Sequence, residues 1–385
     1  MITGTINHMA LAALAMASAI YAVPRPITIP LTSRAIGPAS GSLTDYFNGT
    51  DLQWYGNFQA GTPAQTFKVI FDTGSPWFII PGTSCGSTCA GQTAFDGTKS
   101  STFTNLNTPR TVRFGTGGGV QPVGGNLSMN LNLVQDKLTF FGLDAGLTQF
   151  YEILNKTGPI VNNPPWDGIV GMMNKRNGSV FQNLVNGGLD PLFSVYFPPK
   201  SVNSGAGELT LGGINTNRYT GNVTYFPLAF SNANLWQLNS TGLTVNGQTS
   251  TLLSTPQTWI FDSGTSNLVL PKNLTEAIYA LVSPDIKPVG SLGAYGIACN
   301  KINTLNARIS VSFTGIDGAS HQLVVPSTEL NVGPFNASDT SSTALCQTLI
   351  NADDQFLIGG ASLLKHWYSV WDQGNSRMGF AAAAH

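Results

Sequence analysis

One twelve-residue segment occurs twice in this chain, and this repetition constrains the fold more than any other feature of the sequence. Residues 70–81 read IFDTGSPWFIIP and residues 260–271 read IFDSGTSNLVLP, so the two align without a gap at an offset of 190 (262 minus 72 for the aspartates). A second motif also recurs: DGIVG ends at Gly171, and FLIGG has Gly359 at the matching place, an offset of 188 (359 minus 171). Two motifs in the same order at nearly the same offset predict two related halves, each with one aspartate.

The repeated aspartates, Asp72 and Asp262, each follow an apolar run that predicts a buried strand. A lone ionised carboxylate is costly to bury, so such a group is normally paired, hydrogen-bonded or protonated. A turn after a strand would explain either copy alone, but it does not explain two matched copies. Each aspartate is followed by a hydroxyl-Gly-hydroxyl run that supplies donors and unhindered backbone, namely Thr73, Gly74, Ser75, Ser263, Gly264 and Thr265. The sequence therefore predicts that the two aspartates are partners.

The composition favours short strands joined by tight turns, because Gly (43 residues) is abundant in a chain of 385 residues. Only 10% of the residues are charged and the net charge is −1, so no nucleic acid or anionic membrane is expected as a partner. Helices are expected only at residues 179–186 and 275–282. The period-2 alternation typical of half-buried strands occurs at Leu127, Met129, Leu131 and Leu133 and at Ile309, Val311 and Phe313.

The first residues have the features of an export signal. Residues 9–23 are apolar and rich in alanine, and Ala17-Ser18-Ala19, or Ala22, offers a cleavage site, so residues 1–22 are predicted to be a signal peptide. The alternative is a disordered or membrane-anchored N-terminus, but the apolar run is shorter than the roughly 18 residues that span a membrane. A secreted glycoprotein is consistent with eight Asn-x-Ser/Thr sequons, which begin at Asn48, Asn126, Asn155, Asn177, Asn222, Asn239, Asn273 and Asn336.

Four cysteines allow three disulfide pairings. The nearest-neighbour pairing joins Cys85 to Cys89 and Cys299 to Cys346, which keeps one bridge in each half of the chain. A zinc site is the competing interpretation, but two cysteines four residues apart without a nearby histidine have poor zinc spacing. Export also favours disulfides.

Taken together, these motifs resemble those of the pepsin-like aspartic endopeptidases, whose signature is Asp-Thr/Ser-Gly-Thr/Ser in both halves. Further segments resemble family elements along nearly the whole mature chain, at residues 166–172, 208–215, 235–239 and 356–372. The resemblance implies a mostly β fold with two pseudo-two-fold-related, β-barrel-like lobes and a central cleft. Residues 23–40 would form a short pro-segment or linker, residues 41–214 the N-terminal lobe, and residues 215–385 the C-terminal lobe.

The resemblance also implies a chemistry in which Asp72 and Asp262 activate a water that attacks the peptide bond, without a covalent intermediate. Thr73 and Ser263 would tie the two aspartate loops together, and Ser75 and Thr265 would hydrogen-bond the outer carboxylate oxygens. Polypeptides would be the substrates of a secreted monomer that needs no cofactor or metal. A Ser-His-Asp triad or a metalloprotease site is disfavoured because the chain has only four histidines, none of them in a nucleophile motif.

Residues 112–120, VRFGTGGGV, correspond to the flap that closes over bound peptide in this family. A phosphate-binding loop is disfavoured because neither Gly-Lys-Ser/Thr nor a helical pattern follows. The family motif is Tyr-Gly-Thr-Gly, and its Tyr bonds a Trp seven residues after the first aspartate. Here those two positions hold Phe114 and Ile79, with Trp77 nearby, so we expect the flap to close by apolar packing. The remaining candidate flap and substrate contacts are Ile70, Gly115, Thr116 and Gly117.

The expected pro-segment is short and contains only Arg25 and Arg34, whereas family pro-segments are longer and have a Lys that pairs with the two aspartates. Autoinhibition of a zymogen by an ion pair is therefore not expected to follow the family pattern. The alternative function is a catalytically impaired pepsin-like binding or inhibitor protein. Such relatives typically lose an aspartate or its hydroxyl neighbours, and this chain keeps both sets.

Overall fold

The fold is built from many short strands, as the glycine-rich, charge-poor composition predicts. The computed structural model describes residues 36–47, 50–116, 120, 122, 127–158, 164–175, 177–199, 206–232, 234–339 and 341–384, and only the backbone of residues 51–52. The predicted signal peptide, residues 23–35 of the predicted pro-segment and the sequons at Asn48 and Asn126 lie outside these ranges.

The described part of the first half contains ten strands, one α-helix and two short 3-10 helices. They are β1 (Ala39–Phe47), β2 (Asp51–Ala60), β3 (Gln65–Asp72), β4 (Phe78–Pro81), η1 (Thr83–Cys89), η2 (Gly97–Lys99), β5 (Thr104–Phe114), β6 (Leu127–Phe140), β7 (Leu143–Thr157), β8 (Gly168–Gly171), α1 (Val180–Asn186), β9 (Leu192–Tyr196) and β10 (Gly207–Leu211).

The described part of the second half is also mainly strand. Its elements are η3 (Thr216–Arg218), β11 (Tyr219–Pro227), β12 (Gln237–Val245), β13 (Gln257–Phe261), β14 (Leu268–Leu270), α2 (Lys272–Val282), β15 (Lys287–Val289), β16 (Ala294–Ala298), α3 (Cys299–Ile302), β17 (Ile309–Thr314), β18 (Ser320–Val325), η4 (Ser327–Leu330), β19 (Gly333–Pro334), β20 (Leu345–Gln347), β21 (Ile350–Ala352), β22 (Ile358–Gly359), α4 (Ala361–Leu364), β23 (Trp367–Asp372) and β24 (Arg377–Ala383).

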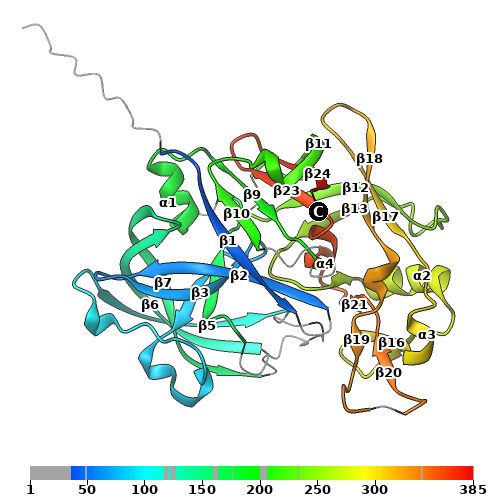
Figure 1. Cartoon of the computed structure of the whole chain (residues 1–385), viewed down its shortest axis with the longest axis horizontal. Helices are drawn as coiled ribbons and strands as arrows, with labels where there is room; N and C mark the ends of the chain where they lie inside the picture. Colours follow the sequence, from blue (N-terminus) through cyan, green and yellow to red (C-terminus); the bar gives the residue numbers. More distant parts are fainter. Residues whose placement is uncertain are drawn as a thin grey trace, which may run out of the picture. The chain divides into compact units, whose positions relative to one another are not determined.

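Among the described residues, the strands form three sheets. The largest has the order β11-β24-β23-β9-β10-β1-β2-β3-β8-β4-β7-β6-β5, so it draws strands from both halves of the sequence. The second half also builds a sheet with the order β18-β17-β12-β13-β22-β14-β21 and a smaller one with the order β15-β16-β20-β19. Figure 1 shows the blue strands β1 and β2, which lie in this sheet between β10 and β3. The mostly β character that the sequence predicts is confirmed.

The two halves repeat one strand pattern around each aspartate. In the first half β3 pairs in parallel with β8, β8 pairs antiparallel with β4, and β4 pairs in parallel with β7. In the second half β13, β22, β14 and β21 repeat the same three pairings in the same order. The duplicated sequence motifs are therefore the strands that position the two aspartates.

The structure corrects the alignment of the second repeated motif by one residue. Val170 lies opposite Phe71 and Phe78, and Gly359 lies opposite their repeat equivalents, so the structural partner of Gly171 is Gly360. The offset is thus 189 (360 minus 171), and the sequence match of Gly171 with Gly359 was wrong. Because FLIGG ends in two adjacent glycines, residue identity alone does not distinguish the two registers.

Both predicted helices are present, and one begins earlier than predicted. In α1 the Ser179 hydroxyl accepts a hydrogen bond from the Gln182 N–H at 3.1 Å, a standard N-terminal cap. The second helix, α2, begins at Lys272 rather than at Thr275, and Pro271 precedes it without a side-chain cap. Pro271 is the N-cap residue with a non-helical ψ of 143°, and its carbonyl accepts the first intrahelical hydrogen bond, from the Thr275 N–H at 2.9 Å. Asn273 and the residues after it therefore lie inside the helix.

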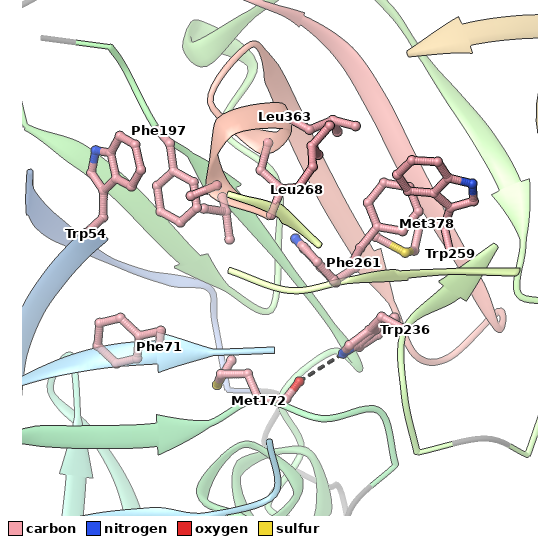
Figure 2. Packing of buried hydrophobic residues seen from close by; sticks show 14 of the residues in the cluster. Trp54, Phe71, Met172, Phe197, Trp236, Trp259, Phe261, Leu268, Leu363 and Met378 are labelled. Carbon is pink, nitrogen blue, oxygen red and sulfur yellow. Dashed lines mark hydrogen bonds between the residues drawn. The ribbon is translucent and has the colours of Figure 1, made fainter. Parts of the chain in front are cut away.

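The core joins the two halves through aromatic packing. The largest group of buried apolar residues includes Trp54 and Phe71 from the first half and Trp236 and Trp371 from the second. Figure 2 shows a close-up of this packing, in which the Trp236 indole N–H donates a hydrogen bond to the Met172 carbonyl. That bond is 2.9 Å long, and Trp236 is fully buried. The halves therefore share one core.

Both disulfides follow the nearest-neighbour prediction. Cys85 is bonded to Cys89, and Cys299 is bonded to Cys346. Among the described residues, no helix is both long enough and apolar enough to cross a membrane.

Candidate active site

The two repeated aspartates meet in a buried site. Asp72 ends β3, and Asp262 directly follows β13. Each is only 7% exposed. The Gly74 N–H contacts both carboxyl groups, at 2.9 Å from Asp72 Oδ1 and 3.1 Å from Asp262 Oδ1. Glycine is required there, because a Cβ on Gly74 would lie 2.4 Å from Asp262 Cγ; on Gly264 it would lie 2.5 Å from Asp72 Cγ. Each loop thus fits closely over the opposite carboxyl group.

Reciprocal hydrogen bonds tie the two aspartate loops together, as predicted for Thr73 and Ser263. The Thr73 N–H donates to Ser263 Oγ at 3.1 Å, and the Ser263 N–H donates to Thr73 Oγ1 at 2.9 Å. Each hydroxyl then donates to the opposite strand: Thr73 to the Phe261 carbonyl at 3.1 Å, and Ser263 to the Phe71 carbonyl at 2.5 Å. These bonds fix the relative position of the two carboxyl groups.

Burial and a like-charged neighbour raise the pKa of Asp72 well above its usual value. Burial is the larger cause, since it disfavours the charged form, and the carboxylate of Asp262 adds to it. The Ser75 hydroxyl and the Gly74 N–H act in the opposite direction. The balance keeps a proton on the pair to higher pH than an isolated carboxyl group would.

The hydroxyls of Thr265 and Ser75, which were predicted to bond the outer carboxylate oxygens, differ in their hydrogen bonds. The Thr265 hydroxyl donates to Asp262 Oδ2 at 2.6 Å, as predicted. The Ser75 hydroxyl is buried near Asp72 and lowers its pKa, but it forms no hydrogen bond of standard geometry with any described residue. The N–H groups of Gly74 and Gly264 also donate to Asp262, which therefore accepts three hydrogen bonds from the protein.

The flap strands place Phe114 in an apolar cluster. Phe114 ends β5 opposite Leu127 of β6. It is half-buried against a cluster that contains Ile79, and Trp77 packs against the same cluster. Phe114 and Trp77 therefore pack against one apolar cluster that contains Ile79.

Trp77 is held by two further residues. Its ring meets Tyr151 of β7 edge-on at 5.7 Å between centroids. The Arg110 guanidinium of β5 lies 4.3 Å from the Trp77 ring centroid, a distance at which a cation is attracted to the aromatic face. Trp77 thereby links the aspartate loop to a flap strand and β7.

Two predicted flap residues reach the second half of the chain. The Thr116 hydroxyl lies 3.0 Å from the Thr265 hydroxyl, beside the Asp262 carboxyl group. A Cβ added to Gly115 would lie 2.7 Å from the ring of Phe356, so the backbone passes close to that ring. Gly117 lies outside the described residues.

Ile70, a predicted substrate contact, is buried on the same face of β3 as Asp72.

One buried residue that contacts the second aspartate loop was missed by the sequence analysis. Gln53 of β2 is fully buried, and its side-chain N–H donates to the Gly264 carbonyl at 2.7 Å and to Ser266 Oγ at 3.3 Å. No motif marks Gln53 in the sequence, because its partners lie more than 200 residues away.

A mostly β fold of two related halves, with one buried aspartate from each half at a shared site, defines the aspartic protease class. Comparison with known proteins agrees. The sequence profile of the family described as Eukaryotic aspartyl protease matches residues 53–383. The chain therefore belongs to this family of aspartic-type endopeptidases, which act on polypeptides, and the resemblance seen in the sequence is confirmed.

Individual relatives cover most of the chain at low identity. Pepsin A of Suncus murinus is 30% identical and Pepsin A of Rhinolophus ferrumequinum is 29% identical; each comparison covers 92% of this chain, with 86% and 89% of the relative, respectively. Vacuolar protease A of Arthroderma otae is 28% identical over 87% of this chain and 80% of the relative. The similarity thus extends over both halves.

Proposed function

We propose that this chain is a catalytically active, secreted aspartic endopeptidase in which Asp72 and Asp262 are the catalytic residues. One observation carries the proposal: a single backbone N–H, that of Gly74, donates to both carboxyl groups at 2.9 and 3.1 Å. Two carboxyl groups that share one donor are close enough to share a proton and to hold a water between them.

The surroundings of the two carboxyl groups assign them different roles. The pair holds one proton in this proposal, because burial and the neighbouring carboxylate raise the pKa of Asp72. The negative charge belongs on Asp262, which accepts three hydrogen bonds. Asp262 then acts as the general base on the water, and Asp72 donates a proton to the carbonyl oxygen of the scissile bond. The product of this step is a tetrahedral gem-diol. It collapses when Asp262 passes the proton it took from the water to the departing nitrogen, a gem-diol hydroxyl returns a proton to Asp72, and the C–N bond breaks.

Secretion is supported by the N-terminal sequence and by the two disulfides. The apolar segment with its small-residue cleavage site precedes a domain that contains both bridges, and disulfides persist mainly outside the reducing cytosol. A vacuolar destination is the competing proposal, because one relative carries that word in its name. Residues 23–40 are proposed as a short pro-segment or linker, and residues 41–214 and 215–385 as the two lobes.

The activity is tested by incubating the correctly processed protein with a denatured protein substrate from about pH 3 to 7. We expect cleavage at acid pH, inhibition by a statine-type transition-state mimic, and a loss of at least about a thousandfold in kcat for Asp72→Asn and for Asp262→Asn. Asp190→Asn, which alters an exposed carboxyl group, is the matched control and should retain full activity.

Two outcomes contradict the proposal. Cleavage that survives in Asp72→Asn would show that another group performs the chemistry. No cleavage at any pH by folded, processed protein would favour the pepsin-like binding or inhibitor protein. The compartment is tested separately, by sequencing the N-terminus of protein recovered from the medium and from the vacuole of expressing cells.

A further inference from the structure

Three buried side-chain amides converge on one carbonyl oxygen close to the candidate active site. The oxygen is that of Val120, in the flap sequence. It accepts hydrogen bonds from Gln347 Nε2 at 2.7 Å, Asn351 Nδ2 at 2.9 Å and Asn267 Nδ2 at 3.0 Å. The three amide residues are 2%, 6% and 4% exposed, respectively. We call these three residues the amide cluster.

Two members of the amide cluster lie in or beside the sheet that positions the second aspartate, and the third, Gln347, ends β20 of the smaller sheet. Asn267 lies two residues after Thr265, whose hydroxyl binds Asp262. Asn351 of β21 is the register partner of Val269 in β14, the strand that begins directly after Asn267. The cluster is also close to the flap, because Thr116 contacts Thr265.

The cluster offers more donors than its present acceptor can use. A carbonyl oxygen has two lone pairs, but three N–H donors point at this one. Two members of the cluster also bond to each other: Gln347 Nε2 donates to Asn351 Oδ1 at 3.1 Å, which orients both amides. Buried amides are costly when they lack acceptors, so the site strongly favours an acceptor oxygen from outside the strands that build it.

We propose that the amide cluster is a substrate subsite that binds a carbonyl oxygen of the peptide, and that the Val120 carbonyl occupies this subsite in the absence of substrate. The acceptor is an uncharged carbonyl, because the charge on the aspartate pair and Asp353, two residues after Asn351, disfavour a carboxylate. The oxygen comes either from the peptide main chain or from an Asn or Gln side chain. This inference rests on the proposed endopeptidase function.

Because Val120 and the substrate would use the same donors, deleting the donors weakens the free and the bound states together. Affinity alone is therefore an insensitive test. The sensitive quantity is the coupling between the cluster and one substrate oxygen, which a double-mutant cycle isolates.

The experiment compares matched peptide pairs that differ by one carbonyl, at each position on either side of the scissile bond. In one arm Gln is replaced by Met, or Asn by Leu; in the other, one main-chain carbonyl is replaced by a methylene. For wild type we expect one position at which losing the oxygen lowers kcat/KM about 3- to 10-fold, the effect of one uncharged hydrogen bond. In the double variant Gln347→Met/Asn351→Leu, the ratio of kcat/KM between the two peptides of the pair should fall to about one at that position. The ratios at the other positions should not change. The arm that responds identifies the source of the oxygen.

The control variant is Asn331→Asp, which alters a partly exposed amide of the same half that bonds Asn303 at 2.8 Å and should leave every ratio unchanged. If the double variant does not fold, Asn267→Leu provides the same test with one donor removed. A ratio that is the same in wild type and in the cluster variants overturns the subsite. If wild type cleaves nothing, the proposed function has failed; the ratios are then read from Kd values for the same peptide pairs, and they decide the subsite separately.

Discussion

At the scale of single residues, the aspartate pair shows how burial and a like-charged neighbour raise the pKa of an ordinary side chain. Asp72 is held in a dry site opposite a like charge, so its pKa is raised. The Ser75 hydroxyl lies close by without a standard hydrogen bond. The two carboxyl groups are therefore not equivalent, although their sequence motifs are nearly identical.

The raised pKa of Asp72 predicts how stability depends on pH. Below the usual value of 3.8, this group is protonated in both the folded and the unfolded chain and has no effect. As pH rises from that value to the raised folded-state pKa, only the unfolded chain releases the proton, so the folded state loses stability, by about 1.4 kcal/mol per unit of pKa difference.

Asn cannot titrate, so Asp72→Asn should become progressively more stable than wild type as pH rises through that window. Urea unfolding at intervals between about pH 3 and 7 measures the difference in the free energy of unfolding. A difference that stays constant across this range would show that Asp72 does not titrate as the structure indicates. Asp190→Asn, at an exposed position, controls for the loss of a surface charge.

At the scale of strands, close backbone contacts decide which glycines are essential. Gly171 and Gly360 pack against the backbone of the aspartate loops: a Cβ on Gly171 would lie 2.5 Å from the Ser75 carbonyl oxygen, and one on Gly360 would lie 2.2 Å from the Asn267 carbonyl oxygen. A Cβ on Gly360 would also lie 2.4 Å from the carbonyl oxygen of Thr265, the repeat equivalent of Ser75 (265 minus 75 is 190), which agrees with the one-residue correction of the repeat.

Adjacent glycines provide a matched test of this register. Gly360→Ala should lower the free energy of unfolding by at least about 3 kcal/mol, because backbone atoms cannot move away as a flexible side chain can. Gly359→Ala should cost less than about 1.5 kcal/mol, since its nearest neighbours would be at an ordinary 3.7 Å. Chemical denaturation measures the free energy of unfolding of both variants. If Gly359→Ala were the less stable of the two, the original alignment of Gly359 with Gly171 would be restored.

The flap strands allow a second test, of apolar closure. Phe114 packs where the family has a hydrogen-bonding Tyr, against a cluster that contains Ile79. Phe114→Tyr should lower kcat/KM several-fold, since the new hydroxyl lacks its Trp partner. Ile79→Trp alone should also lower kcat/KM, because the larger ring strains the core. In the double variant the two losses should be less than additive by about 1 kcal/mol, because the Tyr hydroxyl and the Trp ring can then form a hydrogen bond. Strictly additive effects of the two substitutions on kcat/KM would contradict this account of the flap.

At the scale of the whole molecule, the two halves are joined into one folding unit. In the largest sheet, β9 of the first half pairs with β23 of the second, register partners including Val195 and Ser369. The Trp236 indole and the Met172 carbonyl connect the halves through the core. Because the aspartate loops also exchange hydrogen bonds, neither half retains its site geometry alone.

This sharing predicts one cooperative unfolding transition. Trp236→Phe removes a buried donor and leaves the Met172 carbonyl unpaired, which should cost about 1–3 kcal/mol. Native-state hydrogen exchange should then show reduced protection in both halves by a similar amount. Loss confined to residues 215–384 would instead indicate two independently stable lobes.

The sequence by itself determined the strand-rich class, the paired aspartates with their hydroxyl neighbours, and the disulfide partners. The class follows from composition and local periodicity, the pairing of the aspartates from a repeat that can be counted along the chain, and the disulfide partners from the spacing of the cysteines. Only the tertiary structure decided the one-residue register of Gly360, the earlier start of α2, the unequal roles of Ser75 and Thr265, and the convergence of the amide cluster on Val120. The physical reason is that most of these features depend on contacts between residues far apart in sequence, which local patterns do not specify. The exception is α2, whose start depends on a local feature, namely that Pro271 is the N-cap of the helix.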